Sequence, residues 1–240
     1  YMSSVLVETA TPVPTPSPGD AFEEAVRGWR EFGRETEISH RDGVAVYRNE
    51  FWTSKQRAGH ALHEISYRAC FKPQLPGFFI DRLTQKGEAV FDPFMGRGTT
   101  LLEARLKGRR AVGSDINPLS RILLGPRLTP PSIDVITTRL EAIDFSAAAE
   151  TPDELLVFYH PDTLRQICVL RDYLLSKTSA GTLDIVDEWI RMVAVNRLSG
   201  HSSGFFSVYS LPPNQAVSLK SQARINARRK QTPPLRNVPG

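Results

Sequence analysis

The residue types in one short stretch, residues 91–100, are those that shape a ligand-binding loop. An apolar run leads into the stretch and predicts a short strand, which Pro93 ends. Gly96 and Gly98 follow, and glycine allows the backbone to turn sharply and to approach a ligand without side chains in between. The stretch therefore predicts a strand that runs into a tight turn, with the ligand bound at the turn.

A helix, a second strand and an acid follow the turn at the spacing of one βαβ unit. An amphipathic helix is predicted over residues 101–106, a strand over residues 110–114, and Asp115 stands at the end of that strand. In nucleotide-binding βαβ folds, an acid at this place accepts hydrogen bonds from ribose hydroxyls. The three glycines that seat a pyrophosphate are not matched here. We therefore expect an adenosine-containing ligand, although Asp115 could instead cap the segment that starts at Asn117.

Three consecutive motifs resemble those of the amino-group DNA methyltransferases. Residues 92–100 look like motif I of that family, D-P-F-x-G-x-G-T-T, whose ligand is S-adenosylmethionine. Residues 113–118 are similar to the next motif, and residues 66–76 resemble the motif that lies over the methionine part of the cofactor. The resemblance covers about residues 60–120 and implies an α/β fold with a Rossmann-like methyltransferase sheet.

The resemblance also implies which residues bind the cofactor. Asp115 would hold the ribose, Ile116 would pack beside adenine, and residues 67–73 would close the pocket from the other side. A bulky residue in place of Gly98 would then block cofactor entry, although Gly96 and Gly98 could instead serve only the packing of strand and helix. Packing and solvation are the alternative roles for Tyr67 and Lys72. The full set of expected cofactor-binding residues is Tyr67, Lys72, Pro73, Phe91, Asp92, Pro93, Phe94, Gly96, Gly98, Thr99, Thr100, Asp115, Ile116 and Asn117.

The sequence leaves the catalytic residues unassigned. Enzymes of the resembled family flip the target base out of the duplex and hold its amino group with a polar-Pro-Pro-aromatic tetrad. Two stretches come near to this pattern: residues 210–214, in which Leu211 separates Ser210 from the prolines, and residues 232–235, which have a leucine in place of the aromatic residue. Neither matches it, so no catalytic residue is named.

The expected activity is methyl transfer from S-adenosylmethionine to the exocyclic amino group of cytosine (N4) in double-stranded DNA. Adenine-N6 DNA methylation, an RNA or small-molecule methyltransferase, and a non-catalytic nucleic-acid-binding subunit remain open as alternatives. The resemblance implies about seven strands, whereas two are secure here. We therefore expect an incomplete sheet, with the catalytic tetrad beyond Gly240 or on a second polypeptide, and little methyl transfer by this chain alone.

Composition narrows the class of protein. The chain has 240 residues, 40% of them hydrophobic, and a net charge of +4. It contains no run of 18 apolar residues and no signal-peptide pattern, so we expect no membrane association and a cytoplasmic location.

Cys70 and Cys168 are far apart and are expected to be buried thiols. His60 and His63 offer too few ligands for a metal, and no metal site is expected.

The chain divides into four predicted parts. Residues 1–20 read as a disordered Pro-rich leader, residues 21–128 as the S-adenosylmethionine-binding part, and residues 129–200 as a helical region. Residues 201–240 read as a basic loop or tail that could contact DNA, because residues 220–236 hold six basic residues and no acid.

Several individual elements are predicted as well. Asp20 is expected to cap a helix over residues 22–32, and a short strand is expected over residues 43–47 after an Asp-Gly turn. Further helices are predicted over residues 133–143, 164–175 and 183–198, the second of them capped by Asp162.

Overall fold

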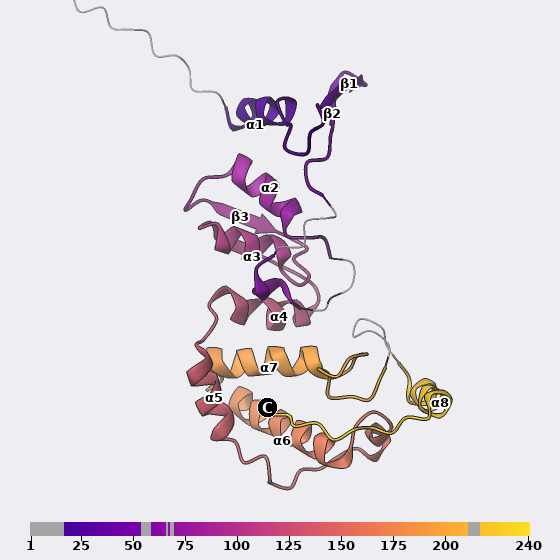
Figure 1. The fold of residues 1–240 in the computed structure, drawn as a ribbon. Coiled ribbons are helices and arrows are strands. Elements are labelled where there is room, and N and C mark those ends of the chain that lie inside the picture. The colour runs from indigo at the N-terminus through magenta and orange to yellow at the C-terminus, as the bar shows by residue number, and fades with distance from the viewer. Residues whose placement is uncertain (1–16, 54–58, 66, 68–69, 211–216) are drawn as a thin grey trace, which may run out of the picture.

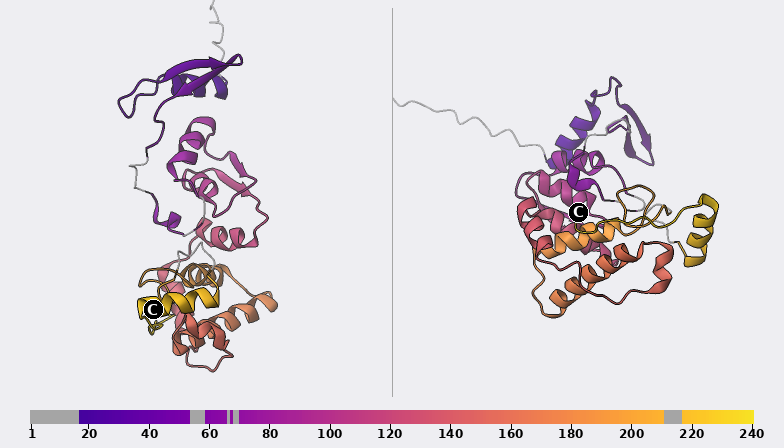
Figure 2. Two further views of the ribbon diagram at one scale, coloured as in Figure 1. Left: turned by 90° about the vertical axis from the view of Figure 1, so that its right-hand side faces the viewer. Right: turned by 60° about the horizontal axis from the view of Figure 1, so that its bottom comes forward.

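The computed structural model describes residues 17–53, 59–65, 67, 70–210 and 217–240, and these form three tiers (Figure 1). The upper tier contains a helix and a hairpin, the middle tier contains a βαβ unit, and the lower tier is helical. The left-hand view of Figure 2 shows the same three tiers from the side. Most of the predicted leader, residues 1–16, lies outside the described residues.

The upper tier starts with helix α1 (Pro18–Arg27). The Ser17 hydroxyl accepts a hydrogen bond from the backbone N–H of Asp20 at 3.2 Å, and the Asp20 carboxylate accepts one from the N–H of Ser17 at 3.2 Å. This capping box makes Ser17 the cap, so the predicted cap at Asp20 is wrong, as is the predicted helix end at residue 32.

The hairpin of the upper tier confirms the predicted turn. Strands β1 (Glu37–Arg41) and β2 (Val44–Arg48) pair antiparallel around Asp42 and Gly43, whose φ angles are 51° and 79°. Two successive positive φ angles are the geometry that Asp-Gly favours in a two-residue hairpin turn. The predicted strand over residues 43–47 is therefore present and begins one residue later.

The middle tier confirms the predicted βαβ unit. Strand β3 (Ala89–Asp92), helix α3 (Thr99–Leu106) and strand β4 (Arg110–Gly113) follow in order, and the two strands pair in parallel with Phe91 opposite Val112. Helices α2 (Gln74–Leu83) and α4 (Pro118–Leu128) and the short 3-10 helix η1 (Ala61–His63) surround the unit. Each sheet within the described ranges has two strands, so the class is mixed α/β and the larger Rossmann-like sheet remains an expectation.

The lower tier contains a helix at each of the three places where the sequence predicted one. It contains helices α5 (Ile133–Glu141), α6 (Pro161–Ser179) and α7 (Ile185–Arg197), and the short 3-10 helix η2 (Asp153–Val157). Its core is formed by Ile136, Ile143, Leu170, Leu174 and Ile190. Met192 of α7 packs with Leu123 of α4, which joins the lower tier to the middle one.

Two details of the lower tier differ from the sequence-based expectation. The cap of α6 is His160, whose Nδ1 accepts a hydrogen bond from the N–H of Asp162 at 3.2 Å, so Asp162 lies inside the helix. Part of the segment expected as a loop or tail, residues 201–240, forms helix α8 (Leu219–Arg229). The His160 cap is a local contact that was missed because histidine is not among the preferred capping residues. Helix α8 was missed because its docking depends on residues distant in the sequence.

The two cysteines are free thiols in different surroundings. Cys168 is buried, as expected, whereas Cys70 is exposed, so the expectation of a buried thiol there is wrong. A separate expectation concerned the membrane: among the described residues, no helix has both the length and the apolar character needed to cross a bilayer.

Candidate functional site

The loop between β3 and α3 is held in place by backbone hydrogen bonds. The N–H of Gly98 donates to the carbonyl of Met95 at 2.6 Å, and the N–H of Met95 donates to the carbonyl of Ser114 at 3.1 Å. The φ angles of Gly96 and Gly98 are +51° and +81°, which residues other than glycine rarely adopt. The loop therefore turns back against the end of β4, at the carboxyl end of the parallel strands.

Asp115 joins the loop to the start of α4. Its Oδ2 accepts a hydrogen bond from the N–H of Gly96 at 2.7 Å, and its Oδ1 accepts one from the N–H of Asn117 at 2.8 Å. These two donors, Asn117 first, lower the pKa of Asp115 below its ordinary value. An ionised carboxylate offers about four acceptor positions, so further acceptor capacity remains for a ligand hydroxyl.

The alternative capping role falls to the neighbouring Asn117. The Asn117 side chain caps α4, since its Oδ1 accepts a hydrogen bond from the N–H of Leu119 at 3.0 Å. Asp115 acts one step earlier, on the N–H of Asn117 itself. The acid therefore organises the turn, and its carboxylate lies at the ligand-binding end of the βαβ unit.

Tyr67 lies next to the loop, as expected from the motif that precedes it. A Cβ built on Gly96 would lie 3.4 Å from Cε1 of Tyr67. The Nδ2 of Asn117 donates to the Tyr67 hydroxyl at 3.4 Å. The structure thus brings together Tyr67, Gly96, Asp115 and Asn117, which come from three separate parts of the sequence.

Three apolar side chains of the expected site are exposed to solvent. Phe94 is 86% exposed, Ile116 is fully exposed, and Phe91 is 61% exposed. The N–H of Phe94 donates to Oδ1 of Asp92 at 3.0 Å, and this bond fixes the turn after Pro93. Exposed apolar side chains beside a polar anchor suit an aromatic ring such as a nucleobase.

Gly98 has a packing role next to helix α4. A Cβ at Gly98 would lie only 2.5 Å from Cδ1 of Leu124, inside the contact between α3 and α4. Leu124 is buried against Leu101 and Leu102. The missing side chain at residue 98 therefore makes room for helix packing, while room for a ligand at this residue remains an expectation.

The remaining expected residues are spread over other contacts. Thr99 is buried and its hydroxyl accepts a hydrogen bond from Nε of Arg97 at 3.1 Å, while Thr100 faces an apolar groove beside Phe71. Pro73 lines a separate hollow with Trp52 and Phe78, and the adjacent Lys72 is exposed. Asp115 is not among the residues that line this hollow.

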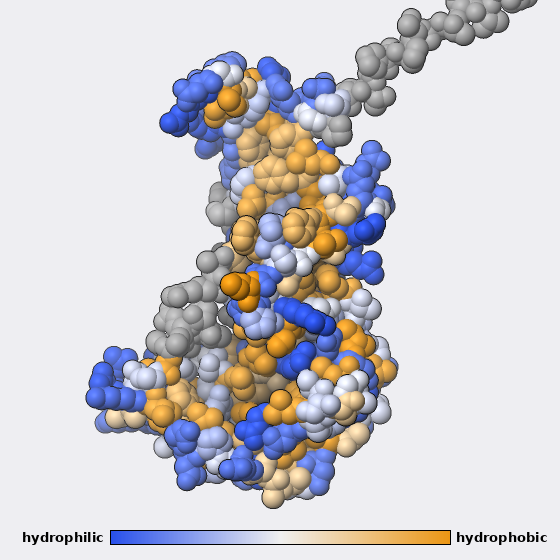
Figure 3. Space-filling model, turned by 180° about the vertical axis from the view of Figure 1, so that it is seen from behind, coloured by the Kyte–Doolittle hydropathy of each residue, from blue (hydrophilic) through white to orange (hydrophobic). Residues whose placement is uncertain are grey.

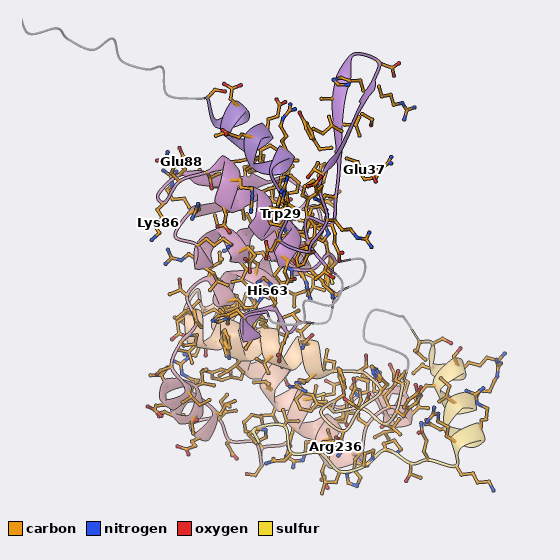
Figure 4. All side chains as sticks on the ribbon, turned by 45° about the horizontal axis from the view of Figure 1, so that its top comes forward. Trp29, Glu37, His63, Lys86, Glu88 and Arg236 are labelled. Carbon is orange, nitrogen blue, oxygen red and sulfur yellow. The ribbon has the colours of Figure 1, made fainter. Side chains whose placement is uncertain are left out.

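The two near-matches to the catalytic tetrad remain unassigned. Ser210 is buried, and residues 211–214 lie outside the described residues. Residues 232–235 precede Arg236, whose N–H donates to the Thr163 hydroxyl of α6 at 2.8 Å. Figure 4 shows Arg236 in the lower tier, away from the middle tier that holds the loop.

Two arginines fix the loop and were not identified from the sequence. The guanidinium of Arg97 donates to the carbonyl of Ile65 at 2.7 Å, and Arg127 of α4 donates to the carbonyls of Leu62 at 2.9 Å and of Arg97. Arg127 is 2% exposed, and burial together with the charge of Arg97 lowers its pKa to about 10. For Arg127, the available signal was a basic residue among the apolar residues Leu123, Leu124 and Leu128.

A buried histidine pairs with a glutamate behind the loop. Nε2 of His63 lies 2.8 Å from Oε1 of Glu103 of α3, and both side chains are nearly buried. Figure 4 places His63 at the base of the middle tier. The pair ties η1 to α3, and nothing in the spacing of the two residues predicted it.

The comparisons with known proteins concern the part of the chain that contains this loop. Residues 20–120 match the DNA methylase family model for N6 and N4 methyltransferases. The chain is 32% identical over 112 residues to the Type II methyltransferase M.MvaI of Kocuria varians, an alignment that covers 45% of this chain and 23% of the relative. It is 34% identical over 76 residues to M.MjaII of Methanocaldococcus jannaschii, covering 32% of this chain and 14% of the relative.

A third relative extends the alignment. The chain is 27% identical over 154 residues to the Type II methyltransferase M.BsoBI of Geobacillus stearothermophilus, covering 55% of this chain and 29% of the relative. The alignments thus span less than a third of each curated relative. No solved structure matches the chain. Residues 20–120, which include the βαβ unit and its loop, are therefore similar to the amino-group DNA methyltransferases.

Proposed function

We propose that this chain binds S-adenosylmethionine at the β3–α3 loop and serves methyl transfer to the N4 amino group of cytosine in double-stranded DNA. The observation that carries the proposal is the Asp115 carboxylate, which links the N–H of Gly96 to that of Asn117 and keeps spare acceptor capacity. Methyltransferases of this family generally use that cofactor. Adenine-N6 is the alternative target, and the sequence similarity to cytosine-N4 members favours cytosine.

The residues around the loop fit the chemical parts of the cofactor. Asp115 would accept hydrogen bonds from the ribose hydroxyls, and Ile116 and Phe94 would pack against adenine. Tyr67, beside Gly96, would border the methionine part. When bound, the cofactor supplies a methyl group activated by a sulfonium. Lys72, Pro73 and Thr100 are assigned to the cofactor by the resemblance alone, since Pro73 and Thr100 line other hollows.

This chain's own residues would orient the cofactor and hold the loop. Arg127 and Arg97 fix the backbone of the turn through carbonyl contacts, and Asp115 remains ionised because two N–H groups lower its pKa. A preformed loop reduces the ordering cost of binding. The group that holds the target amine stays unassigned, and neither the fold nor the relatives lend support to a second polypeptide as its source.

Titration with S-adenosylmethionine tests the cofactor site. Asp115→Asn removes the charge and one acceptor oxygen, and we expect affinity to fall roughly 5- to 150-fold, which corresponds to about 1–3 kcal/mol for a charge-assisted hydrogen bond. Asp134→Asn is the matched control, because Asp134 is exposed on α5. Equal affinity of the Asp115→Asn variant and the unchanged chain would contradict the assignment.

Product analysis of treated DNA tests the reaction. Duplex DNA incubated with the protein and labelled S-adenosylmethionine should yield N4-methylcytosine. N6-methyladenine would establish the alternative target, and label transferred only to RNA would contradict the DNA assignment. Duplex binding without methyl transfer would favour a nucleic-acid-binding subunit.

A further inference from the structure

The last part of the sequence carries a strongly one-sided charge. From residue 189 to residue 240 the chain has no aspartate or glutamate. Over the same range it has eight basic residues: Arg191, Arg197, Lys220, Arg224, Arg228, Arg229, Lys230 and Arg236. Five of them fall in or directly after α8. Such segregation produces a local positive potential that the modest net charge of the chain does not reveal.

Helix α8 stands at the side of the lower tier and is docked by amide groups. Figure 1 and the right-hand view of Figure 2 show it projecting beyond the other lower helices. Nε2 of the buried Gln222 donates to the carbonyl of Tyr209 at 2.9 Å, and Nδ2 of Asn226 donates to the carbonyl of Val157 at 2.8 Å. Gln231 also donates to the Tyr209 carbonyl at 2.9 Å. These contacts fix which face of the helix points inward.

The outward face carries a regular row of cations. Lys220, Arg224 and Arg228 recur every four residues and are all exposed. Residues four apart lie on one helix face, so the row extends about 12 Å along the axis. Within the described parts of the chain, none of the three forms an ion pair with a carboxylate. Figure 3 shows the hydrophilic outer surface of this projection from behind.

Arg229 and Lys230 differ from this row. The guanidinium of Arg229 lies 3.4 Å from the centroid of the Tyr209 ring and therefore helps to dock the helix. Lys230 ends the helix with a φ of 50°, a left-handed conformation that glycine usually supplies. A cation at this end also interacts favourably with the helix dipole.

We propose that Lys220, Arg224 and Arg228 form a phosphate-contact surface for duplex DNA. This inference rests on the proposed function, because it names a surface that holds the substrate of the same protein. Three cations in a row match the closely spaced negative charges of a duplex, about one per 1.7 Å of its axis. The hydrogen bonds of Gln222 and Asn226 fix the orientation of α8, so the three cations keep their positions relative to one another on its outward face. Lysines in an unstructured tail would not keep such fixed positions.

The composition of α8 favours a duplex over other polyanions. A helix that lies in a lipid surface needs a broad apolar face, whereas the face opposite this row is made of the amides Gln222 and Asn226. Single-stranded nucleic acid is usually held by stacking on aromatic side chains, and α8 contains none. Backbone phosphate contact without base reading is therefore the mode that the surface supports.

The test is the salt dependence of duplex affinity for the triple variant Lys220→Gln/Arg224→Gln/Arg228→Gln. Three phosphate contacts contribute roughly −2.7 to the slope of log affinity against log salt concentration. Between 50 and 200 mM salt, these contacts alone would lower the affinity of the unchanged chain roughly 40-fold. The variant should lack this part of the decrease. Absolute affinity at 50 mM should also fall. The substitutions leave the docking amides untouched, and circular dichroism with the thermal midpoint checks the fold.

A second triple variant controls for total charge. Arg41→Gln/Lys86→Gln/Arg110→Gln removes the same three charges from exposed positions in the upper and middle tiers. Lys86 points away on the side opposite α8 (Figure 4). We expect its salt slope to stay within about one unit of the unchanged chain, because a slope reports only charges at the contact. The proposal would be overturned if the two triple variants changed the salt slope of duplex affinity by the same amount. It would also be overturned if the α8 triple variant left that slope unchanged.

The same samples separate this proposal from the cofactor assignment. S-adenosylmethionine affinity of the α8 triple should equal that of the unchanged chain. The α8 triple could lose part of its salt dependence while neither it nor the unchanged chain binds S-adenosylmethionine. This result would support the DNA-contact surface and refute the proposed function. Tighter binding to single-stranded RNA or to phosphatidylserine vesicles than to a 20-base-pair duplex would overturn the choice of partner.

Discussion

Replacing Gly98 with alanine should destabilise the protein through packing and backbone strain. The φ of Gly98 is +81°, and a left-handed conformation costs a residue with a Cβ about 1–2 kcal/mol. The added Cβ would lie 2.5, 2.8 and 2.9 Å from three side-chain atoms of Leu124. Overpacking of a core typically costs about 1–3 kcal/mol. We therefore expect the free energy of unfolding to fall by about 2–5 kcal/mol, measured by urea denaturation.

Two further variants separate the causes. Gly181→Ala is the matched control, because Gly181 has a φ of +66° and nothing within 4 Å of the added Cβ, so only the backbone cost of about 1–2 kcal/mol should appear. In the double variant Gly98→Ala/Leu124→Ala the clash is removed, and the combined loss should be smaller than the sum of the single losses by about 1–3 kcal/mol. Additive losses, or a Gly98→Ala variant of normal stability that has lost only cofactor affinity, would refute this reasoning.

Three further changes have defined outcomes. Lys230→Gly should raise the thermal midpoint by relieving the left-handed conformation, worth about 1 kcal/mol, and a lowered midpoint would contradict this. Arg139 lowers the pKa of Asp184 to about 2, so the stability from this pair is present above about pH 4 and is lost as the pH falls toward 2. Because Asp184 is half exposed, that loss is about 1 kcal/mol or less. Between pH 4 and pH 2, the free energy of unfolding of Asp184→Asn should therefore decrease less than that of the unchanged chain, as measured by urea denaturation at each pH. Arg127→Lys should lower the free energy of unfolding by about 1–3 kcal/mol, since one ammonium cannot reach all the carbonyls that the guanidinium contacts; unchanged urea denaturation would contradict it.

The sequence predicted the elements around the loop because their signals are local. A short apolar run, two glycines and a helix pattern are enough to place β3 and α3, and Asp115 follows from the end of the next strand. The Asp42–Gly43 turn was predicted for the same reason, since its conformation depends on the two residues themselves.

The contacts that fix the loop could not be predicted in this way. The pairs Arg127 with Arg97, His63 with Glu103, and Gly98 with Leu124 join residues that are 26 to 40 positions apart, and which partner they meet is decided by helix packing. The exposed state of Cys70 and the amide docking of α8 are likewise tertiary effects. The expected cofactor residues therefore remain a proposal that rests on the cluster around Asp115.

The most direct measurement is the structure of the protein crystallised with S-adenosylhomocysteine, the demethylated form of the cofactor. The account predicts the nucleoside beside the β3–α3 loop, with ribose hydroxyls within hydrogen-bond distance of the Asp115 carboxylate and adenine against Ile116. Density for the nucleoside elsewhere, or an Asp115 carboxylate that contacts only Gly96 and Asn117 in a crystal grown with saturating ligand, would contradict it.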